Sequence, residues 1–114
     1  MANDARRHPR IRTFVPAVAT HEGRNIDAVI LNLGRGGAFI LDDRRLARAA
    51  EISMTLELGE HGILPVIARV VRRQEVDPRG LDVPGLGVKF FDLTPSAEAA
   101  LERFVGQQPL RLAA

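Results

Sequence analysis

The order of apolar and polar positions predicts a chain built mostly of short strands. The clearest case runs from Glu51 to Leu58, where apolar residues alternate with Ser53, Thr55 and Glu57. Strict alternation of this kind is typical of a strand with one buried face. Further apolar runs bounded by turn residues are expected to be strands as well; they cover residues 12–19, 26–33, 38–41, 64–75 and 86–91.

The last periodic segment predicts a helix instead. Thr94 can cap its N-terminus, Pro95 suits the first helical position, and Gly106 ends the pattern. Its apolar residues recur at helical spacing, namely Ala97, Ala100, Leu101, Phe104 and Val105. Six strands followed by one amphipathic helix indicate a mainly β protein, a small antiparallel barrel with a C-terminal α-helix packed on it. The expected barrel domain covers residues 12–106, between an N-terminal arm of residues 1–11 and a loose tail of residues 107–114.

Composition narrows the class of protein. With 114 residues, 46% of them hydrophobic, the chain is long enough for one modest core. The lack of cysteine excludes disulfides, thiolate metal sites and cysteine nucleophiles. No metal-ligand spacing and no plausible Ser–His–acid set is present, so we expect neither a metal site nor an enzyme. Without an apolar run near the roughly 20 residues of a membrane span, or a signal peptide, we expect a cytoplasmic protein.

Positive charge is concentrated at the N-terminus. The net charge is only +2, but the arm contains the run Arg6-Arg7-His8-Pro9-Arg10-Ile11-Arg12. Guanidinium groups are planar, permanently charged and suited to bidentate contacts with phosphate or guanine. Beyond the arm, basic residues are interleaved with acidic ones, and tryptophan and tyrosine are absent. DNA or RNA binding is therefore not expected, because base-stacking platforms are missing.

A second candidate feature is the glycine-rich stretch Gly34-Arg35-Gly36-Gly37, which separates two apolar runs. Glycine tolerates positive φ and lets another backbone or a ligand come close, so the stretch predicts a tight turn between strands. It is open whether this is a plain hairpin turn or part of a ligand site. Arg35 is equally open, either as a solvent-facing residue or as a phosphate contact.

These motifs resemble those of the PilZ domains, bacterial receptors for cyclic di-GMP built as six-stranded antiparallel barrels with a C-terminal helix. Arg6-Arg7-His8-Pro9-Arg10 matches the family's RxxxR motif, and Asn32-Leu33-Gly34-Arg35-Gly36-Gly37 matches [D/N]xSxxG except at the serine. Segments 67–72 and 85–94 resemble later parts of the family pattern. The resemblance implies that Arg6 and Arg10, with Arg7 as an auxiliary, take guanine edges and phosphates, and that Asn32 meets the Watson–Crick edge of a guanine.

The same resemblance implies that the turn from Gly34 to Gly37 lets the ligand approach backbone N–H groups. No cofactor is expected beyond the ligand, cyclic di-GMP. We expect the arm to order on binding and to signal to a separate protein partner in motility, pilus or regulatory output. Gly34 replaces the motif serine and removes one hydrogen bond, worth about 0.5–1.5 kcal/mol. The alternative is therefore a degenerate PilZ domain that binds no nucleotide and acts as a protein–protein interaction module.

Overall fold

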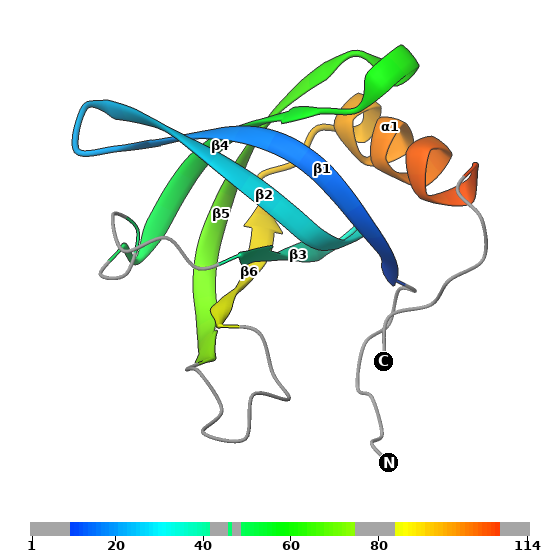
Figure 1. The fold of residues 1–114 in the computed structure, drawn as a ribbon. Coiled ribbons are helices and arrows are strands. Elements are labelled where there is room, and N and C mark those ends of the chain that lie inside the picture. The colour runs from blue at the N-terminus through cyan, green and yellow to red at the C-terminus, as the bar shows by residue number, and fades with distance from the viewer. Residues whose placement is uncertain (1–9, 42–45, 47–48, 75–83, 108–114) are drawn as a thin grey trace.

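The computed structural model describes residues 10–41, 46, 49–74 and 84–107. Six strands are followed by one helix (Figure 1). Their bounds are β1 Arg10–His21, β2 Arg24–Gly34, β3 Gly37–Leu41, β4 Glu51–Glu57, β5 Ile63–Gln74, β6 Gly85–Phe91 and α1 Pro95–Gly106, with a 3₁₀ turn η2 at Gly59–His61. The predicted six-stranded barrel with a C-terminal helix is confirmed.

The six strands close into an antiparallel barrel in the order β1-β2-β3-β6-β5-β4. Closure gives every strand two neighbours, so the barrel has no edge strand. Pro16 lies in β1 opposite Val29, next to a register shift between Arg12 and Val15. The strand also begins at Arg10, two positions before the predicted start of the barrel domain.

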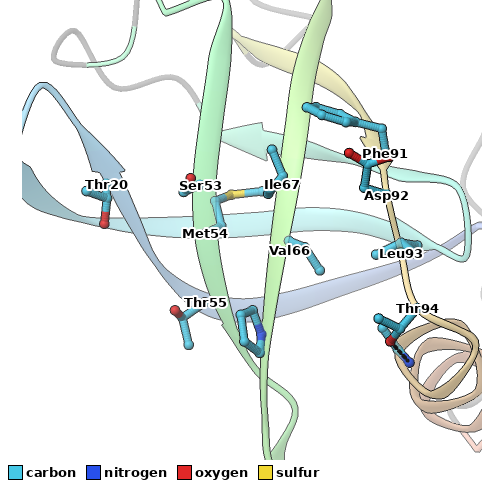
Figure 2. Close-up of a pocket in the computed structure, with 12 residues that line it drawn as sticks. Thr20, Ser53, Met54, Thr55, Val66, Ile67, Phe91, Asp92, Leu93 and Thr94 are labelled. Atoms are coloured by element: carbon cyan, nitrogen blue, oxygen red, sulfur yellow. Dashed lines mark hydrogen bonds between the residues drawn. The ribbon is translucent and has the colours of Figure 1, made fainter.

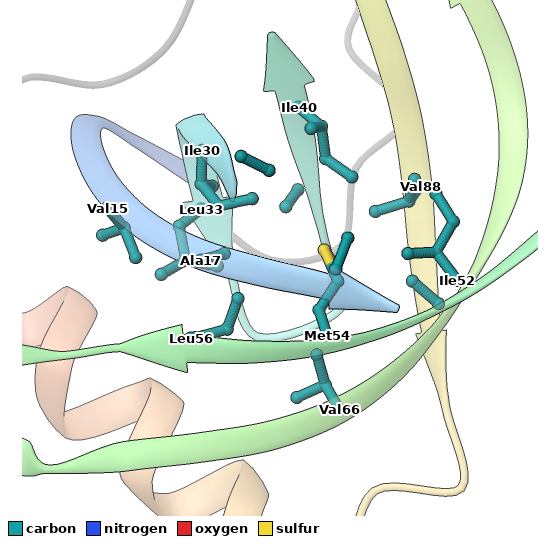
Figure 3. Close-up of a cluster of buried hydrophobic side chains, with 14 of the residues drawn as sticks. Val15, Ala17, Ile30, Leu33, Ile40, Ile52, Met54, Leu56, Val66 and Val88 are labelled. Atoms are coloured by element: carbon teal, nitrogen blue, oxygen red, sulfur yellow. The ribbon is translucent and has the colours of Figure 1, made fainter. Parts of the chain in front are cut away.

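Alternation along each strand sends one set of side chains into a single core. In β4 the apolar positions Ile52, Met54 and Leu56 are buried, as the sequence pattern predicts. Figure 3 shows core side chains that come from all six strands, among them Val15, Ile30, Ile40, Met54, Val66 and Val88. No polar or charged residue among those described is buried, so the core of the barrel consists of apolar side chains.

The helix α1 packs against this core beside the β4–β5 hairpin (Figure 1). Thr94 caps it, since its hydroxyl accepts a hydrogen bond from Ala97 N at 3.1 Å, and Pro95 occupies the first position, as predicted. The buried side chains of α1 are Ala97, Leu101 and Phe104. This stripe is therefore core packing, as its burial shows.

Candidate functional site

The glycine stretch forms the turn between β2 and β3. β2 ends at Gly34 and β3 begins at Gly37, so only Arg35 and Gly36 lie between the strands. The glycines with positive φ are Gly23, Gly59 and Gly62, so no glycine of this turn uses the left-handed region. The predicted turn is present, but its glycines are not needed for positive φ.

The backbone of these glycines is tied to the two neighbouring strands. Gly34 pairs with Arg10 of β1, and Gly37 pairs with Lys89 of β6. Gly36 extends the contact to β6, since its carbonyl accepts a hydrogen bond from Phe90 N at 2.9 Å. The turn is thus held on both sides by neighbouring strands, and it presents a fixed backbone surface next to the point where the arm enters β1.

A row of residues crosses four strands beside this turn. In the register of the sheet, Asn32 lies opposite Phe39, Phe39 opposite Gly87, and Gly87 opposite Arg72. Directly paired residues of neighbouring strands present their side chains on the same face. Because Leu33, Ala38 and Ile40 belong to the core, Asn32 and Phe39 face the outside of the barrel. We call Asn32, Phe39, Gly87 and Arg72 the outer row.

Two glycines of β6 shape the outer row. A Cβ atom on Gly85 would collide with the Phe39 ring and lie 2.6 Å from the Ile40 carbonyl oxygen. A Cβ atom on Gly87 would lie 3.3 Å from Arg72 Nε. Because Gly85 has no Cβ, the Phe39 ring can pack beside the backbone of β6, and only 6% of the Phe39 surface is exposed. The Arg72 guanidinium stands over its ring, 5.8 Å from the centroid, in a cation–π arrangement.

Asn32 carries the most unusual atom of the row. Its Oδ1 is buried, yet it has no hydrogen-bond partner within the described part of the chain. A buried polar atom without a partner costs about 1–3 kcal/mol of stability. An unpaired buried acceptor of this kind can take a hydrogen bond from the donor of a bound molecule.

The structure places the predicted site residues unevenly. Asn32, Gly34 and Gly37 come together around the turn, and β1 brings the backbone of Arg10 alongside Gly34. Arg6 and Arg7 lie outside the described residues.

The side chain of Arg35 forms ion pairs with the C-terminal helix. It is half-buried and directed toward α1, with Nη1 3.2 Å from Glu102 Oε1 and Nε 3.5 Å from Glu98 Oε2. The side chain is therefore neither fully solvent-facing nor free. Its guanidinium joins the glycine turn to the C-terminal helix.

The sequence places Arg69, Arg72 and Arg73 on the barrel exterior, with the alternative that one of them reaches the ligand, and it assigns no role to Phe39. Arg72 lies on the same strand as Arg69 and Arg73, and the alternation of β5 does not single it out. The register shift between Val70 and Arg72 turns Arg72 toward Gly87. Arg69 instead lies over Phe91 at 5.0 Å, and Arg73 donates to the Ala49 carbonyl at 2.6 Å. The signal that could have found the row is Gly85-x-Gly87, two glycines on one face of a strand, which mark a close approach.

A separate groove lies between the outer face of β4–β5 and the segment that leads into α1 (Figure 2). It has a volume of about 360 Å³ and is lined mainly by hydroxyl and apolar side chains, such as Thr55, Ile67 and Phe91. Asp92 is its charged lining residue, and no arginine or lysine lines it. This groove does not include the outer row, and its chemistry does not suit an anionic ligand.

Other site classes find no support in the described residues. Within those ranges no three His, Asp or Glu side chains gather in a way that could hold a metal ion. His21 pairs with Glu22 at 3.2 Å, and His61 contacts Gln107 at 2.8 Å, so the two histidines lie in unrelated places. No helix in the described part of the chain is long and apolar enough to cross a membrane.

Solved structures with this fold are found among known proteins. The chain is similar to the PilZ domain of YcgR from Escherichia coli, solved with c-di-GMP, with a TM-score of 0.72 and 17% identity over 90% of each chain. It is also similar to the Bacillus subtilis inhibitor of motility MotI/DgrA, with a TM-score of 0.76 and 16% identity over 92% of this chain and 51% of that one. The MrkH–c-di-GMP complex of K. pneumonia matches with a TM-score of 0.72 and 18% identity, over 90% of this chain and 50% of that one.

The chain thus spans about half the length of the latter two proteins. At these identities the likeness establishes the fold. No curated protein matches the chain at a significant level.

A family model adds the sequence-level evidence, because the PilZ domain model matches residues 4–107, nearly the whole chain. PilZ domains are non-catalytic receptor domains for c-di-GMP. From the match, the closed barrel and the glycine turn together, we conclude that the chain belongs to the PilZ domain family.

Proposed function

We propose that this protein is a receptor for cyclic di-GMP and that the ligand binds over the outer row and the glycine turn. The observation that carries the proposal is the buried, partnerless Oδ1 of Asn32. A guanine offers two adjacent donors, N1–H and N2–H, on its Watson–Crick edge. An amide carbonyl that lacks a partner is a suitable acceptor for both, and binding removes the cost of leaving it unpaired.

Arg72 extends the proposed site beyond the residues expected from the sequence. Its guanidinium already lies over the Phe39 ring at cation–π distance. The face of a guanidinium plane that points away from a ring is a good stacking surface for a base. Arg72 lies in the same cross-strand row as Asn32. In our proposal Asn32 recognises the edge of a guanine, and Arg72 supplies a planar contact.

The arginine arm completes the proposed site. Arg10, at the start of β1, pairs with Gly34 of the turn. Arg6, Arg7 and Arg10 then contact guanine edges and phosphates, while the backbone of Gly34 to Gly37 leaves room for the ligand. A segment dense in arginine gains little from ordering alone, and the dianionic ligand supplies the counter-charge. Ordering the arm changes the surface that a protein partner meets, which is how binding becomes a signal in the cytoplasm.

Calorimetric titration with cyclic di-GMP tests this function. We expect binding by the wild type and weaker binding by Arg6→Ala and by Arg10→Ala. Arg24→Ala is the matched control, because Arg24 is an exposed arginine at the start of β2. It should bind as the wild type does. No heat of binding up to about 100 µM ligand, or equal affinity in all four proteins, would contradict the proposal.

The competing function is a ligand-independent interaction module. The observation in its favour is Gly34, which lacks the hydroxyl of the motif serine. Titration of Gly34→Ser separates the two. A receptor should bind before the change and more tightly after it, whereas a chain that has lost the site should bind in neither form.

A further inference from the structure

The ion pairs of Arg35 connect the proposed ligand site to the C-terminal helix. Arg35 lies inside the glycine turn, between the backbone of Gly34 and that of Gly36. Glu98 and Glu102 stand one helical turn apart on the same face of α1, and each contacts one side of the guanidinium. Among the described residues, no other ion pair joins α1 to the barrel.

The placement of these charges has a direct electrostatic consequence. The two carboxylates neutralise the one cation that the turn itself contributes, and they add negative charge beside the place where the ligand phosphates are proposed to bind. A phosphate near the turn attracts the Arg35 guanidinium and repels Glu98 and Glu102. All three side chains are partly exposed, between 39% and 53%, so the pairs are exchangeable rather than locked in the core.

We propose that Glu98 and Glu102 restrain ligand affinity, and that Arg35 is shared in competition between α1 and the anionic ligand. This inference rests on the proposed receptor function. Coupling between two sites is reciprocal. The carboxylates therefore weaken the binding of cyclic di-GMP, and the bound ligand weakens the attachment of the first turns of α1 to the barrel by the same factor.

The first test removes the two charges without changing side-chain shape. In Glu98→Gln/Glu102→Gln we expect the affinity for cyclic di-GMP to rise by about threefold to tenfold at low salt, the range for two half-exposed ion pairs. The gain should shrink at high salt because the charges are screened. Glu57→Gln/Glu60→Gln is the control, since it removes the same net charge from exposed residues on β4 and η2.

The second test needs no ligand. Hydrogen exchange of the α1 amides should become several-fold faster in Arg35→Gln than in the wild type, and it should stay unchanged in Arg24→Gln. In the wild type, cyclic di-GMP should speed the same amides. An additional readout is thermal unfolding, which shows whether a variant has lost the fold as a whole rather than the helix contact.

The outcomes distinguish this inference from the receptor function. If the wild type binds, and the Glu98→Gln/Glu102→Gln variant and the Glu57→Gln/Glu60→Gln control bind with the affinity of the wild type, the receptor function stands and the competition is refuted. If neither the wild type nor any variant binds, the receptor function fails and the competition fails with it. Unchanged α1 exchange in Arg35→Gln would refute the role of Arg35 as the link, whatever the ligand does.

Discussion

Replacing Asn32 by alanine should move stability and affinity in opposite directions. In the ligand-free protein, Asn32 Oδ1 is buried without a partner among the described residues. That state costs about 1–3 kcal/mol, and the substitution removes the cost together with some packing. We therefore expect the free energy of unfolding to stay level or to rise by up to about 1 kcal/mol. Most substitutions at partly buried positions lower it instead.

Binding should suffer from the same change. The carbonyl of Asn32 is proposed to accept from two donors of one guanine edge, and such a bidentate contact is worth about 1–3 kcal/mol. At 1.4 kcal/mol for each factor of ten, the loss corresponds to an affinity about 5- to 150-fold weaker. If the proposal holds, Asn32 lowers the stability of the ligand-free protein and contributes to recognition of the ligand.

Urea unfolding of the ligand-free protein and calorimetric titration with cyclic di-GMP measure the two effects. Asn25→Ala is the matched control, because Asn25 is an exposed asparagine whose Oδ1 is already bonded to Thr20 Oγ1 at 3.1 Å. It should leave affinity unchanged. Our reasoning is refuted if Asn32→Ala loses more than about 1 kcal/mol of stability while binding as tightly as the wild type, since Asn32 would then serve the fold alone.

Further substitutions test other parts of the structure. Gly85→Ala should lower the free energy of unfolding by about 1–3 kcal/mol in urea titration, because the added Cβ would lie 2.6 Å from the Ile40 carbonyl oxygen. Gly106→Ala is the control and should not lower the free energy of unfolding by this amount, because the space around Gly106 is open. Thr94→Ala should cost about 1 kcal/mol in thermal or urea unfolding, since it removes the cap of α1. Gly34→Ser should tighten cyclic di-GMP binding by up to about tenfold in calorimetry; weaker binding would mean that the glycine is needed for space.

The fold was predictable because its signals are local. The alternation of Ile52, Met54 and Leu56 defines β4 without reference to any other strand, and Thr94-Pro95 defines the start of α1 in the same way. Where prediction was less accurate, the cause lay in neighbouring strands. β1 begins at Arg10 because Gly34 is there to pair with it, which the polar character of the arm does not reveal.

The candidate site was predictable in part for the same reason. Asn32 and Gly34 belong to one short motif, whereas Arg72 enters the outer row only through a register shift in β5. Counting alternate positions along the strand cannot locate such a shift. The partners of Arg35 are similarly remote, since 67 residues separate it from Glu102. Contacts of this kind become visible only when the chain is folded.

The closed barrel limits the ways in which another protein can bind to this one. A sheet with an edge strand can recruit another protein by adding one of its strands, but here each of the six strands already pairs with a neighbour on both sides over part of its length. A partner must therefore recognise side chains, or the segments that lead into and out of the barrel. The first residue of β1, Arg10, pairs with Gly34, and α1 contacts the same turn through Arg35. The first strand and the last helix of the barrel domain therefore meet at the glycine turn, at one place on its surface.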